Sequence, residues 1–571
     1  MRAETLSPAQ TLAANLLAQL AANGVDHVFL APGARSQSLA IAAGQLAAAG
    51  HIQLHVRLDE RSLGYQALGV GLASGFPAAV ITTSGTAVAN LHPAVLEAHH
   101  AGIPMILLTA DRPAELRGVG ANQTTNQVGI FADAVRDCID VPAPSLADTE
   151  EALAASAAEL AEDAITKAVS LNGPVQLNLG FREPLSATEP GAVEIFERLA
   201  QAQLASDETK SIPIVPVGGC EDPACQADHA AHDLHLGSAG HEGHDHQLQV
   251  HGTPDTVIDL SLKTVVIAGD GGYLARWYCT GLPLLAEPSS GVRHLPESIK
   301  GYLWVLRENQ ALADQVEQVL VFGKPTLSRQ VQALVKRPGV KVFVDPGRHG
   351  IFDPGHNAQV LGDDVEFIGE PDTGWFNAWR NAGRAAVASK PMASTPGRLS
   401  RRELVETIWK NAGKTNPIVL GASRLIREAD YWAPRRERTV FANRGLAGID
   451  GTVATATGIA LTHPGSRVRV LLGDLTLLHD AGSLAIDDQD VSLNLQVIVG
   501  NDHGGTIFEG LEVAQNLGKA DFDRLFKTPQ HIKFDALAAA YGWKYLRVTN
   551  AEELAVAMKL LGRVLIEIPL A

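Results

Sequence analysis

The sequence predicts an α/β fold of three doubly wound, parallel-sheet domains in series, and three observations support this. Short apolar runs of strand length alternate with longer amphipathic or alanine-rich runs of helix length. Most of the short runs end in glycine or polar residues, as expected at the ligand-binding edge of a parallel sheet. The composition also changes sharply twice, which divides the 571 residues into three patterned regions.

The first region, residues 1–190, is predicted to form one α/β domain. The leucines of residues 11–23 recur on one helical face, and the alanine-rich residues 150–169 predict a further helix. Strands are expected at four apolar runs, which are residues 27–30, 78–82, 105–109 and 174–179.

The second and third domains follow two linkers. Residues 205–260 are expected to be a linker or insertion, because Gly, Asp, His and Gln dominate and seven histidines fall between His229 and His251. Residues 385–401, rich in Ala, Ser and Pro, are expected to be a second linker. The middle domain is predicted over 261–385 and the third over 402–571. Their expected strands are 264–268, 319–322 and 341–344, then 418–421, 467–472, 495–499 and 563–568.

The bulk composition excludes several classes of protein. Apolar residues make up 46% of the chain and charged residues 19%, which is typical of a globular protein and not of a disordered one. A net charge of −17 argues against general binding to nucleic acid or anionic membranes. Four cysteines are too few for a disulfide framework, and neither a leader peptide nor a membrane span is recognisable. We therefore expect a cytoplasmic protein.

Two aspartates late in the chain each follow a predicted strand. Asp474 comes after residues 467–472 and Asp502 after residues 495–499, and 28 residues separate them, about one strand–helix–strand unit. In a parallel sheet both lie at carboxyl ends of strands, where open α/β sheets bind ligands. Carboxylates are hard oxygen ligands, so the pair favours Mg²⁺ shared with a diphosphate. The alternative is that each aspartate only caps the following helix.

In the first domain, Glu60 precedes a helix, where an acidic residue ordinarily complements the helix dipole. Nearby, the run Thr83-Ser84-Gly85 follows a strand and opens a helix, so its hydroxyls and amides suit an anion or a polar heterocycle. An N-cap explains one of these hydroxyls but not the cluster. Arg35 and Arg112 stand at further strand ends, and Asn122 and Gln123 supply amides nearby. Each arginine alone is an ordinary surface charge, but together they suit recognition of carboxylates.

The third domain adds a second set of candidates. The glycine-rich segment 441–451 opens a helix, so its amides are available to phosphate oxygens. Ile507 and Phe508 follow the second aspartate and form either an apolar wall over a cofactor ring or ordinary core. The polar and glycine-loop candidates are Ser423, Arg427, Arg444, Gly448 and Ile449.

The His-rich segment has two interpretations. Cys220 and Cys225, followed by His229, His232 and His235, have the spacing of soft ligands for Zn²⁺ or Ni²⁺. The cysteine spacing is loose for a structural zinc site and the flanks are glycine-rich, which favours a solvated loop.

Several strings of residues resemble one known family. They are Asp59-Glu60-Arg61, TSGTAVANLHPA at 83–94, LTADRP at 108–113, GANQ at 120–123, NRG at 443–445, GIDG at 448–451, and the pair GDL at 473–475 and Asn501-Asp502. Together they resemble the menaquinone-pathway synthase family MenD, whose members are thiamine-diphosphate enzymes. The match covers the first and third domains nearly throughout and the middle domain loosely.

The resemblance implies a complete function. It implies pyrimidine-binding, middle and diphosphate-binding domains, and a transferase that decarboxylates 2-oxoglutarate and adds the succinyl carbanion 1,4 to isochorismate. It implies thiamine diphosphate with Mg²⁺ or Mn²⁺, and a homodimer or homotetramer with active sites between subunits. The alternatives are another thiamine-diphosphate 2-oxoacid decarboxylase or carboligase, and a non-catalytic metal-binding protein that uses the His-rich segment.

The resemblance also assigns roles to the candidates. Glu60 becomes the catalytic glutamate that protonates the aminopyrimidine ring, and Asp474, Asp502 and the Gly504 carbonyl become the metal ligands. Many family members have Asn where this chain has Asp502, and Ser where it has Ala34. The added carboxylate is expected to strengthen metal binding. The other cofactor contacts are Thr83, Ser84, Gly85, Gly448, Ile449, Ile507 and Phe508, and the substrate contacts are Arg35, Arg112, Asn122, Gln123, Ser423, Arg427 and Arg444.

Overall fold

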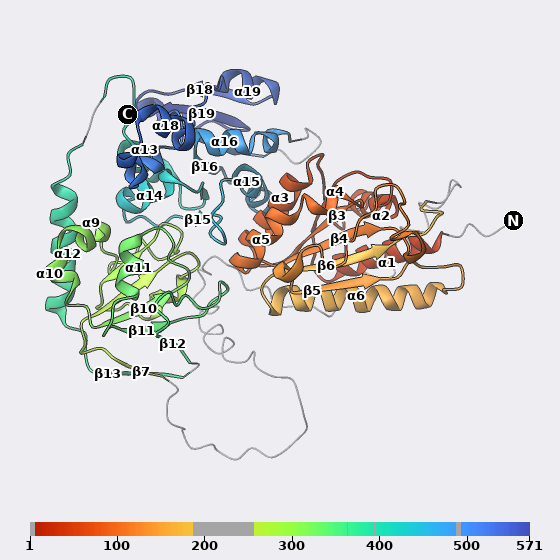
Figure 1. Cartoon of the computed structure of the whole chain (residues 1–571), viewed down its shortest axis with the longest axis horizontal. Helices are drawn as coiled ribbons and strands as arrows, with labels where there is room; N and C mark the ends of the chain where they lie inside the picture. The colour runs from red at the N-terminus through yellow and green to blue at the C-terminus, as the bar shows by residue number, and fades with distance from the viewer. Residues whose placement is uncertain (1–5, 187–255, 363, 393–394, 487–492) are drawn as a thin grey trace, which may run out of the picture. The chain divides into compact units, whose positions relative to one another are not determined.

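The computed structural model describes residues 6–186, 256–362, 364–392, 395–486 and 493–571 (Figure 1). The predicted His-rich segment, with Cys220, Cys225 and the histidines from His229 to His251, lies outside these residues. The chain divides into two compact units, of which unit 1 holds the N-terminal and C-terminal domains and unit 2 holds the middle domain. Every strand pair in the named sheets is parallel, so the predicted α/β class is confirmed.

The first domain is built on a six-stranded parallel sheet with the order β2-β1-β3-β4-β6-β5. Its strands are β1 (His27–Leu30), β2 (Gln53–Val56), β3 (Ala78–Thr82), β4 (Met105–Asp111), β5 (Asp137–Val141) and β6 (Pro174–Gly180). The sequence pattern missed β2 and β5. Both are edge strands with several exposed or half-buried positions, so neither presents the continuous apolar run of a central strand.

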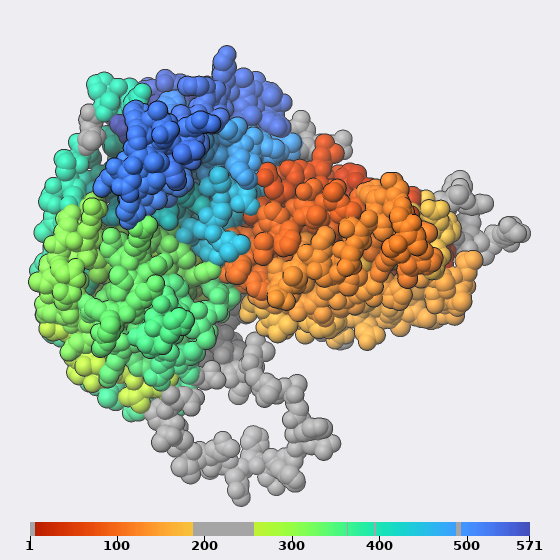
Figure 2. Space-filling model, in the orientation of Figure 1, coloured from red at the N-terminus to blue at the C-terminus, as the bar shows by residue number. Residues whose placement is uncertain are grey.

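Helices cover both faces of this sheet. One face packs against α1 (Pro8–Ala22), α2 (Gln37–Ala48) and α6 (Glu150–Ser170), and the other packs against α3 (Glu60–Ser74) and α5 (His92–Ala101). The domain also contains the short helix α4 (Thr86–Ala89) and the 3₁₀ turns η1 (Ala114–Leu116) and η2 (Ala132–Ala134). The outer side of α6 forms part of the domain surface, drawn in light orange (Figure 2). The helices predicted around 11–23 and 150–169 are therefore present.

The last domain repeats the same topology. Its strand order is β15-β14-β16-β17-β19-β18, which is the order of the first domain when the strands are numbered within each domain. The strands are β14 (Ile418–Leu420), β15 (Val440–Phe441), β16 (Val468–Gly473), β17 (Leu495–Asn501), β18 (Lys544–Arg547) and β19 (Val564–Pro569). The helices are α13 (Arg401–Asn411), α14 (Arg424–Trp432), α15 (Thr452–Thr462), α16 (Asp474–His479), α17 (Val513–Asn516), α18 (Lys519–Phe522), α19 (Phe534–Ala540) and α20 (Ala551–Ala557), with the short turns η4 (Ala481–Leu484), η5 (Thr506–Gly510) and η6 (Asp523–Lys527).

Equivalent helices of the two domains pack on each other. Both α3 and α15 connect the second strand of their sheet to the third, and they belong to one hydrophobic core that includes residues of both sheets. A Cβ atom on Gly69 would lie 2.1 Å from the carbonyl oxygen of Thr455, and one on Gly458 would lie 1.9 Å from that of Gln66. Only glycine permits such a close helix crossing. The first and last domains therefore share a core within one chain.

The middle domain has a five-stranded parallel sheet with the order β12-β11-β10-β8-β9 and a two-stranded sheet of β13 and β7. The strands are β7 (Thr256–Asp259), β8 (Thr264–Ala268), β9 (Leu284–Ala286), β10 (Gln318–Phe322), β11 (Lys341–Val344), β12 (Ala358–Val360) and β13 (Val365–Ile368). Its helices and turns are η3 (Tyr273–Trp277), α9 (Tyr302–Glu308), α10 (Gln310–Ala313), α11 (Arg329–Val335) and α12 (Thr373–Ala388).

Two expected linker boundaries differ from the structure. Strand β7 falls inside the expected linker 205–260. The sequence did not predict it, because its four residues are too few to show a strand periodicity and its partner β13 is distant in the chain. Helix α12 continues to Ala388, inside the expected linker 385–401, and buries Trp375, Trp379 and Val387 along one side.

The structure also bears on membrane spans and on disulfides. Among the residues that the structure describes, no helix is both long enough and apolar enough to span a membrane. The two cysteines within these residues, Cys138 and Cys279, are both free thiols.

Candidate active site

The two predicted aspartates lie at neighbouring carboxyl ends of the last sheet. Asp474 directly follows β16 and Asp502 directly follows β17, and the two strands pair in register up to Gly473 and Gly500. The Asp474 side chain is buried, and its Oδ2 accepts the main-chain N–H of Gly504 at 2.8 Å. Burial, followed by the negative charge of Asp502, raises the pKa of Asp474 to about 6. A cation between the carboxylates would remove this repulsion.

Asp502 has two partners that the sequence did not reveal. Its Oδ2 lies 2.7 Å from the guanidinium of Arg401, with both side chains largely buried, and it accepts the hydroxyl of Thr506. The ion pair offsets part of the charge that aspartate adds at this position. Arg401 is the first residue of α13, and nothing in its local sequence marks it as part of a site.

The donor set fits a hard divalent cation. Two carboxylates and a nearby main-chain carbonyl are oxygen ligands of the kind that Mg²⁺ or Mn²⁺ prefers. Across the part of the chain that the structure describes, no cluster of three or more His, Cys, Asp or Glu side chains is arranged around a metal position. The assignment of Asp474, Asp502 and Gly504 as ligands stays a prediction.

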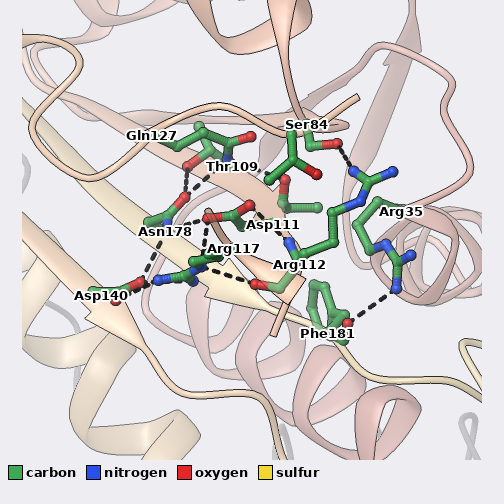
Figure 3. A network of polar contacts seen from close by, with 12 residues as sticks. Arg35, Ser84, Thr109, Asp111, Arg112, Arg117, Gln127, Asp140, Asn178 and Phe181 are labelled. Carbon is green, nitrogen blue, oxygen red and sulfur yellow. Dashed lines mark hydrogen bonds and ion pairs between the residues drawn. The ribbon is translucent and has the colours of Figure 1, made fainter. Parts of the chain in front are cut away.

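Two predicted arginines lie together at the carboxyl edge of the first sheet (Figure 3). The guanidinium of Arg112 donates to the Ser84 hydroxyl and, at 2.9 Å, to the Gln123 carbonyl, both of which are neutral. Arg35 donates to the Phe181 carbonyl at 3.1 Å. Burial and then the charge of Arg35 lower the pKa of Arg112, so the two cations repel each other. An anionic ligand would relieve this repulsion, which makes the pair a candidate carboxylate site.

The loop that carries Arg112 is fixed by a partly buried polar network. Arg117 forms ion pairs with Asp111 at 3.0 Å and with Asp140 at 2.7 Å, and its Nε donates to the Arg112 carbonyl (Figure 3). Asn178 bridges the same two carboxylates through its amide. The sequence analysis did not identify Arg117, Asp140 or Asn178. Arg117 directly follows η1 on the same connection, whereas Asp140 and Asn178 reach it from β5 and β6. Their charges and amides hold Arg112 in place without facing the candidate site.

Thr83, Ser84 and Gly85, which follow β3, form hydrogen bonds with other residues of the first domain. The Ser84 hydroxyl donates to the Gln123 carbonyl, and the Gly85 N–H donates to the Gln127 side chain at 2.9 Å. The Thr83 hydroxyl accepts the main-chain N–H of Arg35 at 3.3 Å. These contacts join the predicted cofactor residues to the predicted substrate residues, and the cofactor role of Thr83, Ser84 and Gly85 stays a prediction.

Glu60 is the first residue of α3 and is half-buried, with the Asn90 amide 3.5 Å from its carboxylate. The start of α3 contacts the segment that follows Asp474. Arg61 donates to the His479 carbonyl at 3.2 Å, and the hydroxyls of Ser62 and Ser483 lie 2.8 Å apart. The structure therefore brings the predicted catalytic residue and the predicted metal-binding domain together within one chain.

The remaining predicted residues lie on loops of the two domains. Ser423 has a φ of 89°, a conformation rare for residues other than glycine, and its carbonyl accepts the Arg427 guanidinium at 2.6 Å. Arg444 is buried, and Asn122 and Gln123 are exposed. Ile507 and Phe508 are half-buried, and their role as an apolar wall over the cofactor stays a prediction. Gly448 and Ile449 are half-buried on the segment that precedes α15.

Comparisons with known proteins give two matching family models and several relatives of one name. Residues 10–130 match the family described as thiamine pyrophosphate enzyme, N-terminal TPP binding domain, and residues 422–566 match its C-terminal TPP binding domain. The 2-succinyl-5-enolpyruvyl-6-hydroxy-3-cyclohexene-1-carboxylate synthase of Leifsonia xyli subsp. xyli is 41% identical over 99% of this chain and 97% of the relative. The proteins of the same name from Clavibacter michiganensis subsp. michiganensis and Arthrobacter sp. are 41% and 39% identical, over 99% and 95% of this chain and 97% and 86% of those relatives.

Proposed function

We propose that this chain, which belongs to the MenD family of 2-succinyl-5-enolpyruvyl-6-hydroxy-3-cyclohexene-1-carboxylate synthases, catalyses the reaction for which that family is named. It is a thiamine-diphosphate-dependent transferase of menaquinone biosynthesis that couples decarboxylation to carbon–carbon bond formation. Its substrates are 2-oxoglutarate and isochorismate, and CO₂ is released. The observation that carries the proposal is identity of 36–41% along nearly the whole chain with relatives of one name.

The paired arginines of the first domain support acidic substrates. Both 2-oxoglutarate and isochorismate carry two carboxylates, and a guanidinium binds a carboxylate through two parallel hydrogen bonds. Arg35 and Arg112 lie close enough to lower the pKa of Arg112, and the hydrogen-bond acceptors of Arg112 are neutral oxygens. We assign both to substrate carboxylates, together with Asn122 and Gln123 on the adjoining loop.

Residues of the last domain complete the proposed substrate site. Arg427 is held by the Ser423 carbonyl, and Arg444 is buried in the segment before α15. We assign Ser423, Arg427 and Arg444 to substrate contacts, which places positive charge on both the first and the last domain.

Asp474, Asp502 and the Gly504 carbonyl would hold Mg²⁺ or Mn²⁺, and Glu60 would hold the proton that activates the cofactor. When bound there with the cation, thiamine diphosphate supplies an electron sink for the carbanion left by decarboxylation. Thr83, Ser84 and Gly85 in the first domain, and Gly448, Ile449, Ile507 and Phe508 in the last, would orient the cofactor and exclude water from it. Half-burial of Glu60 leaves its carboxyl accessible to a ligand.

Substrate preference tests the proposal. CO₂ release is measured from 2-oxoglutarate and from pyruvate, each with and without isochorismate, in the presence of thiamine diphosphate and Mg²⁺. Preference for 2-oxoglutarate, with product formed only when isochorismate is present, supports the assignment. Preference for pyruvate would mean that another thiamine-diphosphate carboligase activity is correct.

We also propose a cytoplasmic homodimer or homotetramer whose active sites combine the first domain of one subunit with the last domain of another, as the family plan implies. Mixing inactive variants tests this arrangement. If sites form between subunits, Glu60→Gln and Asp474→Asn chains mixed after dissociation regain activity, because one site of each mixed dimer receives both intact residues. If each site forms within one chain, no activity returns.

The His-rich segment is proposed to have no part in the reaction. A chain lacking residues 220–251 is expected to keep full synthase activity. A different result would assign a metal-binding role to Cys220, Cys225 and the neighbouring histidines. In that case the deletion variant would be inactive, and full-length protein stripped of metal would regain activity on addition of Zn²⁺ or Ni²⁺.

A further inference from the structure

A carboxylate of the first domain binds two consecutive main-chain amides of the last domain. Glu97 lies on α5 and is 3% exposed. Its Oε1 accepts the N–H of Gly445 at 2.6 Å, and its Oε2 accepts the N–H of Leu446 at 2.7 Å. Hydrogen bonds to an ionised carboxylate are shorter and stronger than those between neutral groups. The segment is therefore held by both oxygens of one buried charge.

The residue at the contact must be glycine. A Cβ atom on Gly445 would lie 2.5 Å from the main-chain oxygen of Glu97 and 3.1 Å from its carboxyl carbon. Main-chain oxygen has little freedom to move, so a side chain there would displace the segment from α5. The pairing of Glu97 with Gly445 is therefore specific in shape as well as in charge.

The amides bound by Glu97 lie within the segment that carries proposed ligand contacts. Arg444 directly precedes them, and Gly448 and Ile449 follow within a few residues. The far end of this segment is also held by the first domain, because the Tyr65 hydroxyl donates to Asp450. Two side chains of the first domain, Glu97 and Tyr65, thus position residues 443–451 of the last domain.

We propose that Glu97 is a positioning residue for catalysis, which acts through the amides of Gly445 and Leu446 to hold Arg444 toward substrate and Gly448 and Ile449 toward the cofactor. The inference rests on the proposed function for the roles of Arg444, Gly448 and Ile449. It goes beyond that function in giving the first domain control over the geometry of a site in the last domain. Without the carboxylate, the buried N–H of Gly445 and the partly buried N–H of Leu446 would both lose this acceptor.

The test is Glu97→Gln, which keeps size and shape. A glutamine amide offers one acceptor oxygen, and its NH₂ group faces the second N–H, so one of the two contacts is lost. Hydrogen exchange of the Gly445 and Leu446 amides is expected to accelerate at least about tenfold. The Kd for thiamine diphosphate with Mg²⁺, from fluorescence titration, and the KM for substrate are each expected to rise about tenfold, with kcat changed less than threefold.

Ser62→Ala is the matched control. It removes a polar contact between the same two domains, the Ser62–Ser483 hydrogen bond, and leaves the Ser483–Asp480 hydrogen bond and residues 443–451 unchanged. Exchange at Gly445 and Leu446, Kd and KM are expected to match the unmodified protein. If both variants change these quantities equally, Glu97 has only a structural role and the proposal is overturned. Unchanged Kd and KM in Glu97→Gln would overturn it as well.

A second variant keeps the test decisive if Glu97→Gln does not fold. Gly445→Ala disturbs the same contact from its other side and is expected to raise Kd and KM while leaving Glu97 intact. Normal Kd and KM in that variant would overturn the proposal. Because amide exchange and cofactor affinity need no substrate, failure of the substrate assignment would leave these two measurements interpretable.

Discussion

The Oδ2 atom of Asp474 accepts the main-chain N–H of Gly504 at 2.8 Å, which ties the end of β16 to the loop after β17. The hydrogen bond favours the ionised carboxylate, whereas burial and the charge of Asp502 oppose ionisation and together raise the pKa to about 6. The carboxylate is thus held in a fixed orientation and at an electrostatic cost that a cation would remove.

Asp474→Asn tests the metal assignment at this position. Asparagine keeps an oxygen for the Gly504 N–H but removes the negative charge that a hard cation needs. We expect the fold to be retained and the Mg²⁺-dependent affinity for thiamine diphosphate to fall by about 100-fold or more. Isothermal titration calorimetry with and without Mg²⁺ measures this, and an affinity that still depends normally on Mg²⁺ would exclude Asp474 as a ligand.

Arg401→Met tests whether the ion pair moderates metal binding. Arg401 lies 2.7 Å from Asp502, with the side chains 15% and 12% exposed. Loss of Arg401 leaves a largely buried carboxylate unpaired, so we expect the metal-free protein to lose about 2 kcal/mol of unfolding free energy. The same uncompensated charge is expected to raise Mg²⁺ affinity about tenfold.

The control for Arg401 is the same substitution in an Asp502→Asn background. Because asparagine at position 502 carries no charge for Arg401 to neutralise, Arg401→Met is expected to change Mg²⁺ affinity less than twofold in this background. Equal effects in the two backgrounds would show that Arg401 influences the metal site by some route other than Asp502.

The strand ends that bear Asp474 and Asp502 were predictable because the signal is local. Each follows a mostly apolar run that leads into glycine, and each run forms a central, largely buried strand of a parallel sheet. The edge strand β18 (Lys544–Arg547) escaped prediction, since its positions are exposed or half-buried and no apolar run marks it.

The supporting residues of the site carry no such local signal. Glu97 reads as an ordinary acidic residue of an amphipathic helix, and its partner Gly445 lies 348 positions away along the chain. Arg401 likewise reads as a solvent-facing residue at a helix start. Their roles depend on the packing of the first domain on the last and on the order of strands in the last sheet, which a single sequence does not specify.

Glu60→Gln tests the catalytic assignment. Glutamine keeps the shape of the side chain at the start of α3 but cannot exchange a proton with the cofactor. We expect turnover to fall about 10²- to 10⁴-fold, the range for loss of a positioned acid–base group. Thermal unfolding and the Kd for thiamine diphosphate by fluorescence are expected to change little by comparison. A fully active variant would remove Glu60 from the mechanism.

Asp480 gives the stability of the last domain a dependence on pH. Its buried Oδ2 accepts the N–H groups of Val453 and Ala454 at the start of α15, and its Oδ1 accepts the Ser483 hydroxyl. Burial, as the dominant cause, raises the pKa of Asp480 from 3.8 to about 6. Because the folded state binds this proton more tightly than the unfolded state, the stabilising contribution is complete below pH 3.8 and is lost as the pH rises through 6.

Asp480→Asn removes this titration and keeps an acceptor for the α15 amides. We expect the unfolding free energy of the unmodified protein, relative to the variant, to fall by about 2 kcal/mol between about pH 4.5 and 7.5. Urea unfolding at a series of pH values measures the difference, with exposed Asp521→Asn as the control for surface charge. A difference that is constant with pH would mean that Asp480 stays ionised throughout, and that its contacts with α15 and Ser483 outweigh the cost of its burial.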